Sequence, residues 1–212
     1  MNAASPTPSE TLAAPAGVRA FQPVWLRVTH WLNALAVVIM VTSGWQIYNA
    51  SPIFASIQFP ESITLGGWLG GALLWHFAAM WLLAANFLVY LVLNVALGRF
   101  SRRLLPITVR SVLHDLWAAV RGALGHEDLS RYNAVQKLAY LAVIVDTVVL
   151  VLSGLAIWKP VQLSLLCDLM GGYDQARVVH FCAMAFMVAF LVVHIVMVVL
   201  VPRSLLTMLR GR

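Results

Sequence analysis

Residues 178–200 read VVHFCAMAFMVAFLVVHIVMVVL, and this stretch decides the fold. It contains no Asp, Glu, Lys or Arg, and it exceeds the roughly 20 predominantly apolar residues that a helix needs to cross a bilayer core. Stretches 28–60 and 62–98 are also uncharged, and 138–158 contains only Asp146. The sequence therefore predicts four membrane-spanning helices, near 24–48, 67–97, 132–157 and 176–200.

The overall composition agrees with a membrane protein, since 61% of the 212 residues are hydrophobic and only 10% are charged. The spans lack the polar faces that a soluble helical core would show, and they do not alternate as the strands of a barrel do. We expect an all-α membrane four-helix bundle as one domain, 23–205. A mobile tail, 1–22, would precede it and a second tail, 206–212, would follow it, both cytoplasmic.

The distribution of basic residues predicts the orientation. Of the 14 Lys and Arg residues, all except Lys159 and Arg177 fall on the side of the two termini and the 98–131 loop. That side should be cytoplasmic. The pI of about 9.9 then indicates contact with anionic lipid headgroups and not with nucleic acid. Within the 98–131 loop, apolar residues at helical spacing predict an interfacial helix near 105–124.

Four of the six histidines lie inside the predicted spans. His180 and His194 are fourteen residues apart, close to four helical turns, so both rings leave nearly the same face about 21 Å apart along the axis. His30 and His76 lie in two other spans. A single buried histidine is often a packing group that hydrogen-bonds a neighbouring helix. Four of them, at two depths, favour metal ligands, because such residues are costly in lipid.

The depths of the four histidines predict two pairs. His30 and His194 lie near the cytoplasmic surface, whereas His76 and His180 lie in the outer half of the bilayer. Two imidazoles on one iron fill both axial positions of a haem, which suits electron transfer and leaves no site for oxygen. The sequence has no Cys-x-x-Cys-His motif for covalent attachment. We therefore expect two non-covalent b-type haems stacked across the membrane.

Arginines and glycines near the histidines fit this hypothesis. Arg27 and Arg177 each precede a histidine by three residues, on the same helical face, where they could meet haem propionates. Gly44 and Gly154 lie at the outer level, where a flat macrocycle could approach the backbone. Interfacial arginines and close helix packing are equally simple explanations of these residues.

The segment Trp25-Leu-Arg-Val-Thr-His-Trp31 resembles the first-span signature of the bacterial cytochrome b561 and nickel–iron hydrogenase b-type cytochrome family. The Trp75-His76 pair and the spacing of His180 and His194 resemble it too, and the likeness covers about 20–205. Tyr132 to Tyr140 looks like the branch whose members accompany periplasmic molybdenum or other redox subunits. The resemblance implies two b-type haems and electron exchange with quinone.

On this basis we expect a multi-pass cytochrome b of the bacterial inner membrane, in a respiratory electron-transport chain. It would connect the quinone pool to a periplasmic redox subunit of the molybdenum-enzyme, hydrogenase or cytochrome c type. Polar residues at the depth of a cytoplasmic-side quinone pocket are Arg27, Asn33, Tyr132, Gln136 and Lys137. Surface or helix-cap hydrogen bonding is the simpler role for most of them.

Two other classes of function stay open. The first is a stand-alone membrane oxidoreductase, such as a superoxide oxidase or a ferric reductase. The second is a metal transporter that uses the intramembrane histidines and Asp146. Asp146 lies between the two histidine levels, where it could relay protons or, more simply, fix helix packing as a neutral hydrogen-bonding group.

Overall fold

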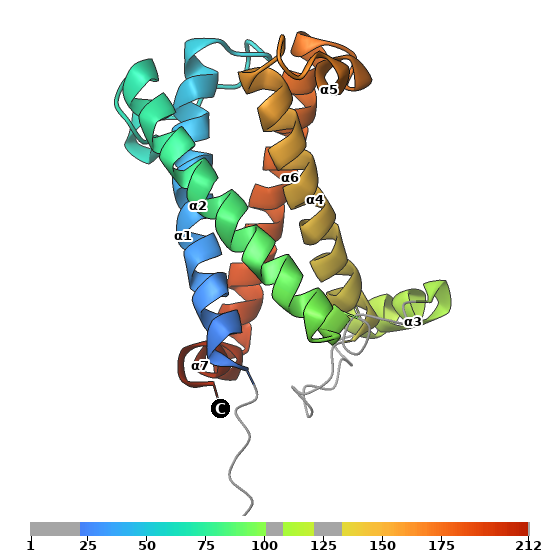
Figure 1. Ribbon diagram of the computed structural model, residues 1–212. Helices are drawn as coiled ribbons and strands as arrows, with labels where there is room; N and C mark the ends of the chain where they lie inside the picture. Colours follow the sequence, from blue (N-terminus) through green and yellow to red (C-terminus); the bar gives the residue numbers. More distant parts are fainter. Residues whose placement is uncertain (1–21, 101–107, 121–132, 212) are drawn as a thin grey trace, which may run out of the picture.

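The computed structural model describes residues 22–100, 108–120 and 133–211, and all regular structure in these ranges is helical (Figure 1). The expected tail 1–22 lies almost entirely outside them. The described elements are α1 (Val24–Ala50), η1 (Glu61–Ile63), α2 (Leu69–Ala96), α3 (Val109–Val120), α4 (Ala134–Trp158), α5 (Ser164–Leu169), α6 (Tyr173–Leu200) and α7 (Pro202–Arg210).

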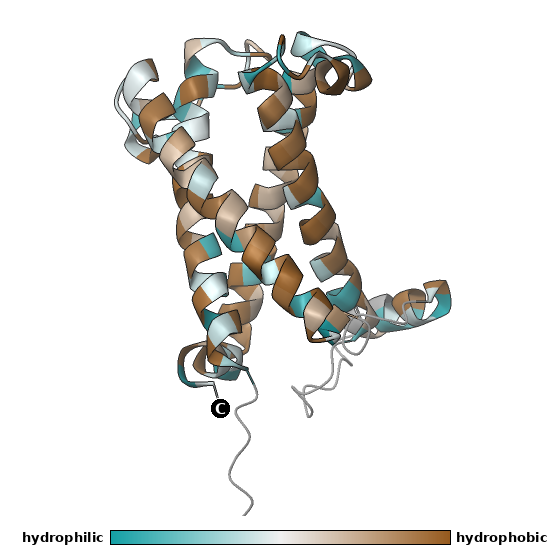
Figure 2. Cartoon of the chain, in the orientation of Figure 1, coloured by the Kyte–Doolittle hydropathy of each residue, from teal (hydrophilic) through white to brown (hydrophobic). Residues whose placement is uncertain are grey.

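Four of these helices, α1, α2, α4 and α6, are long and apolar enough to cross a membrane. Their ends lie within three residues of the predicted ends, so the all-helical fold with four spans is confirmed. Hydrophobic residues predominate along all four helices (Figure 2). Large apolar side chains on each of them are exposed, as expected of surfaces that face lipid.

Sequence signals at the helix ends explain where α4 and α6 begin and where α6 ends. Asn133 caps α4 in a reciprocal capping box with Gln136. Gly172 precedes α6 with a φ of 94°, a left-handed conformation that favours glycine. Pro202 cannot donate the backbone hydrogen bond that would continue α6, and it becomes the first residue of α7.

The spans associate as two antiparallel hairpins, α1 with α2 and α4 with α6. The buried residues of α1 and α2 include the small residues Ala36, Ser43, Ala72 and Ala79. Small side chains let helix backbones approach closely where no hydrophobic effect drives association. The two hairpins stand next to each other (Figure 1), and side chains from both meet between them, as described below.

The two described chain ends lie together at one end of the bundle, called here the terminal end. The Gln22 amide donates to the Gly211 carbonyl at 3.4 Å, and the Trp31 indole donates to the Met208 carbonyl of α7 at 3.4 Å. The segment from 206, expected as a tail, is therefore helical up to Arg210 and packs against α1. The opposite end, which carries η1 and α5, is called the loop end.

Helix α3 also lies at the terminal end, where its Asp115 carboxylate accepts a hydrogen bond from the first amide of α4, Ala134, at 2.7 Å. Val109, Leu113 and Trp117 are exposed along one face of α3, the pattern of an interfacial helix. The parts of the expected 105–124 helix beyond 108–120 lie outside the described residues.

Candidate functional site: paired histidines between the hairpins

The structure brings the four intramembrane histidines together as two pairs. At the loop end, His76 of α2 faces His180 of α6, with ring centroids 6.5 Å apart and planes at 66°. At the terminal end, His30 of α1 faces His194 of α6, with centroids 6.1 Å apart and planes at 63°. These are the loop-end pair and the terminal-end pair. Each pair joins one hairpin to the other, because α6 supplies the second histidine of both.

The spacing within each pair fits one metal ion between two imidazoles. Metal–nitrogen bonds to imidazole are about 2 Å long, and roughly 1 Å separates a ring nitrogen from the ring centroid, so a shared metal holds the centroids about 6 Å apart. A direct nitrogen–nitrogen hydrogen bond would bring them to about 5 Å. Both observed distances match the shared metal. A pair supplies two imidazole ligands, the number that the axial positions of a haem need.

Buried serines hold the rings of the loop-end pair. The Oγ of Ser43 on α1 lies 3.0 Å from Nδ1 of His76, and the Oγ of Ser153 on α4 lies 2.9 Å from Nδ1 of His180. Both serines have no exposed surface. Each hydrogen bond forms inside one hairpin, so it orients the ring independently of the facing histidine on the other hairpin. Ligating histidines generally carry such a partner on their other nitrogen.

The glycine that follows each serine makes room for the same ring. A Cβ at Gly44 would lie 3.4 Å from Cε1 of His76, and a Cβ at Gly154 would lie 3.3 Å from Cε1 of His180. From the sequence, these glycines are expected to let a flat macrocycle approach the helix backbone. In the structure the group next to each glycine is an imidazole ring.

The surroundings of the terminal-end pair are aromatic. Phe190 stacks on His194 at 5.7 Å with planes at 14°, and Trp31 lies edge-on to His30 at 5.4 Å. Among the described residues, neither histidine has a side-chain hydrogen-bond partner. The two pairs are thus alike in spacing and different in what holds their rings.

The two arginines expected near propionates have different environments. The Arg27 Nε is buried and has no hydrogen-bond partner among the described residues, which fits an anionic group placed close to the terminal-end pair. Arg177 donates to the carbonyl and the hydroxyl of Ser51, so it ties the chain after α1 to the start of α6. A role of Arg177 toward a propionate would have to coexist with that tie.

The described residues predicted for a quinone pocket take part in separate local contacts. Asn33 accepts a hydrogen bond at 2.7 Å from Asn86, which also donates to the Thr29 carbonyl, and this network links α1 to α2. Gln136 completes the α4 cap, and Lys137 lies near Asp115. Tyr132 is outside the described residues.

Asp146 is 9% exposed on α4, and its Oδ2 has no hydrogen-bond partner among the described residues. It lies seven residues before Ser153 on the same helix face, hence closer to the middle of the span. Of the two loop histidines, His114 is exposed and lies 3.1 Å from Asp115, and His126 is outside the described residues.

Three functional candidates escaped the sequence interpretation, namely Ser43, Ser153 and Asn86. The Ser–Gly dipeptide occurs twice in the chain, at 43–44 and 153–154. That repetition was a usable signal, whereas nothing near Asn86 in the sequence marks it.

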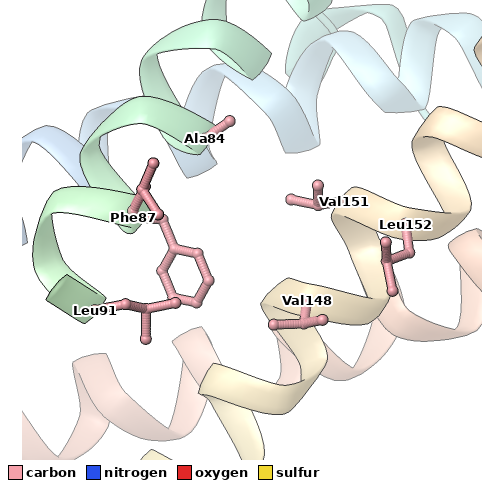
Figure 3. Close-up of a pocket in the computed structure, with 7 residues that line it drawn as sticks. Ala84, Phe87, Leu91, Val148, Val151 and Leu152 are labelled. Carbon is pink, nitrogen blue, oxygen red and sulfur yellow. The ribbon is translucent and has the colours of Figure 1, made fainter. Parts of the chain in front are cut away.

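An apolar cavity of about 270 Å³ lies between α2 and α4 (Figure 3). Its lining residues are Ala84, Phe87, Leu88, Leu91, Val148, Val151 and Leu152. No side chain in this lining offers a hydrogen bond, so the cavity suits a hydrocarbon group and not a polar head.

Comparisons with known proteins agree with the geometry. The family profile of prokaryotic cytochrome b561 matches residues 22–211. A relative from Azospira oryzae, named "Putative protein-methionine-sulfoxide reductase subunit YedZ1", is 56% identical over 194 residues, which cover 92% of this chain and 98% of the relative. A "Probable Ni/Fe-hydrogenase B-type cytochrome subunit" from Cupriavidus necator is 25% identical over 80% of this chain and 74% of its own length.

Proposed function

Since this chain belongs to the prokaryotic cytochrome b561 family of membrane proteins that bind b-type haem, we propose that it transfers electrons across the bacterial inner membrane through two b-type haems. The observation that carries the proposal is the pair of histidine contacts at 6.1 and 6.5 Å, each with room for one metal between the rings. The fourteen-residue spacing on α6 separates the two sites by about 21 Å along the helix.

The chain's own residues would bind and orient the haems. The four histidines would hold the two haem irons, one pair at each level, and Ser43 and Ser153 would orient the loop-end rings. Arg27 would neutralise propionates at the terminal end, where its buried nitrogen has no partner among the described residues. Bound haem would supply a one-electron redox couple.

The orientation and the partners extend the proposal. Basic residues gathered at the terminal end favour a cytoplasmic location for that end, so the loop end would face the periplasm. Both relatives named above are described as subunits, one of a reductase and one of a hydrogenase. The higher identity favours a periplasmic subunit of the protein-methionine-sulfoxide reductase type as the partner of this chain, with quinone as the other redox partner.

The haem content of the purified, full-length chain tests the proposal. A pyridine haemochrome assay should give b-type haem near two per chain, and a quinol should reduce both haems under anaerobic conditions. His114→Ala serves as the matched control, because this histidine is exposed and belongs to neither pair. A chain that binds one haem or none, or haems that a quinol cannot reduce, would contradict the proposal.

A further inference from the structure

We propose that Ser43 and Ser153 are positioning residues that lower the reduction potential of the loop-end haem and leave the terminal-end haem unaffected. This inference rests on the proposed function, because it concerns a haem held by His76 and His180. It adds a reason why one chain would hold two haems of identical ligation with different electron affinities.

The contacts of the two serine hydroxyls determine the direction of the two serine–histidine hydrogen bonds. Ser43 Oγ lies 2.5 Å from the Ile39 carbonyl, and Ser153 Oγ lies 2.7 Å from the Val149 carbonyl, each four residues earlier on its own helix. A serine hydroxyl has one hydrogen, and a carbonyl can only accept. The hydroxyl therefore donates to the carbonyl, and its oxygen accepts the hydrogen bond from the histidine Nδ1–H.

The same hydrogen bonds determine which nitrogen of each imidazole ring carries the proton. A neutral imidazole with its proton on Nδ1 has its lone pair on Nε2, the nitrogen that would bind iron. The serines thus fix the ligating tautomer of both loop-end histidines. Their full burial keeps water from replacing them as acceptors.

The hydrogen bonds also affect the reduction potential of a bound iron. A hydrogen bond accepted from Nδ1–H increases electron density on the ring and makes Nε2 a stronger donor. A stronger donor stabilises the ferric state more than the ferrous state, so the reduction potential falls. Two serines act on one haem from opposite hairpins, and their effects add on the same iron.

The two histidine pairs differ in the acceptors available to their rings. His30 and His194 have no side-chain acceptor among the described residues, and their neighbours Trp31 and Phe190 are aromatic. Removing the serines should therefore change one haem only. The carbonyls of Met40 and Leu150 also lie within hydrogen-bond reach of the loop-end rings, so the rings keep an acceptor and the haem should be retained when the serines are removed.

The experiment is a spectroscopic redox titration of the purified full chain carrying Ser43→Ala, Ser153→Ala or both. The double variant should raise the reduction potential of the loop-end haem, and a tenfold increase in the equilibrium constant for reduction would appear as about 59 mV for a one-electron couple. Each single variant should give part of that change. A His194→Ala background, which should hold only the loop-end haem, assigns the shifted couple.

Thr147→Ala is the matched control, since this buried hydroxyl on α4 also donates to a carbonyl four residues earlier and touches no histidine. It should change neither couple. Unchanged potentials in the double variant, or equal shifts of both couples, would overturn the inference. If the double variant loses the loop-end haem, the same two outcomes in the potentials of the single variants would overturn the inference. A wild-type chain without haem would instead overturn the proposed function.

Discussion

Replacing Gly154 by valine should remove the loop-end haem and spare the terminal-end haem. Gly154 lies against the His180 ring, and a Cβ at this position would be 3.3 Å from Cε1 and 3.7 Å from Nδ1. Carbon atoms in contact prefer about 3.5–4.0 Å, so even alanine would displace the ring by about 0.2–0.7 Å. Metal sites tolerate roughly 0.2 Å in their bond lengths.

The size of the effect follows from this misfit. Alanine stands at the limit of tolerance, so Gly154→Ala should keep both haems and disturb the loop-end couple. Valine adds two methyl groups beside the ring, and overpacking of this kind costs about 1–3 kcal/mol. If that cost falls on the bound state, haem affinity at the loop end decreases by about 5- to 150-fold.

The assay is haem content per chain together with the redox difference spectrum of each variant. Gly154→Val should fall from about two haems toward one, with the loop-end signal lost. Ala85→Val is the control, because Ala85 is exposed on α2 and a valine there would meet lipid. Full haem content with an unchanged spectrum in Gly154→Val would refute the account of Gly154 as the space for the His180 ring.

Three further predictions concern other parts of the chain. His180→Ala should lose the loop-end haem and His194→Ala the terminal-end haem, so their reduced spectra should be complementary. Identical spectra would contradict the pairing. Asp146→Asn should keep both haems and most quinone-linked electron transfer, as expected of a neutral packing group. A variant with both haems and no quinol turnover would instead indicate a proton relay. The backbone N–H of Ala134, followed by the side chain of His114, lowers the pKa of Asp115 below its unfolded value. The resulting stabilisation is therefore fully present above the unfolded pKa, near 4, and is lost as the pH falls through the lowered pKa. The protection factor of the Ala134 amide, which is its exchange rate relative to the intrinsic rate at the same pH, should fall in that acidic window, and Asp115→Asn should remove this pH dependence.

The sequence predicted the elements that depend on local pattern. Uncharged stretches of more than 20 residues located the spans, because hydrocarbon excludes unpaired charge whatever the neighbouring helix. Helical periodicity placed His180 and His194 on one face, and counting from the span ends placed the other two histidines at matching depths.

The contacts that depend on the register between helices could not be predicted in this way. Ser43 meets His76 across 33 positions, and Asn86 meets Asn33 across 53. A shift of one residue between α1 and α2 would break both contacts without changing any local pattern. The tie from Arg177 to Ser51 is of the same kind, since it joins segments 126 positions apart.

The division of contacts between the hairpins suggests an order of assembly. Each serine–histidine bond closes within a hairpin, so translation and insertion of α1 with α2, and later of α4 with α6, suffice to preset one half of the loop-end site. Each histidine–histidine pair, by contrast, spans the boundary between the hairpins. If haem binds between these pairs as proposed, its capture would add a link between the two halves beside the Arg177–Ser51 hydrogen bonds, and we expect haem supply to affect the yield of assembled protein as well as its activity.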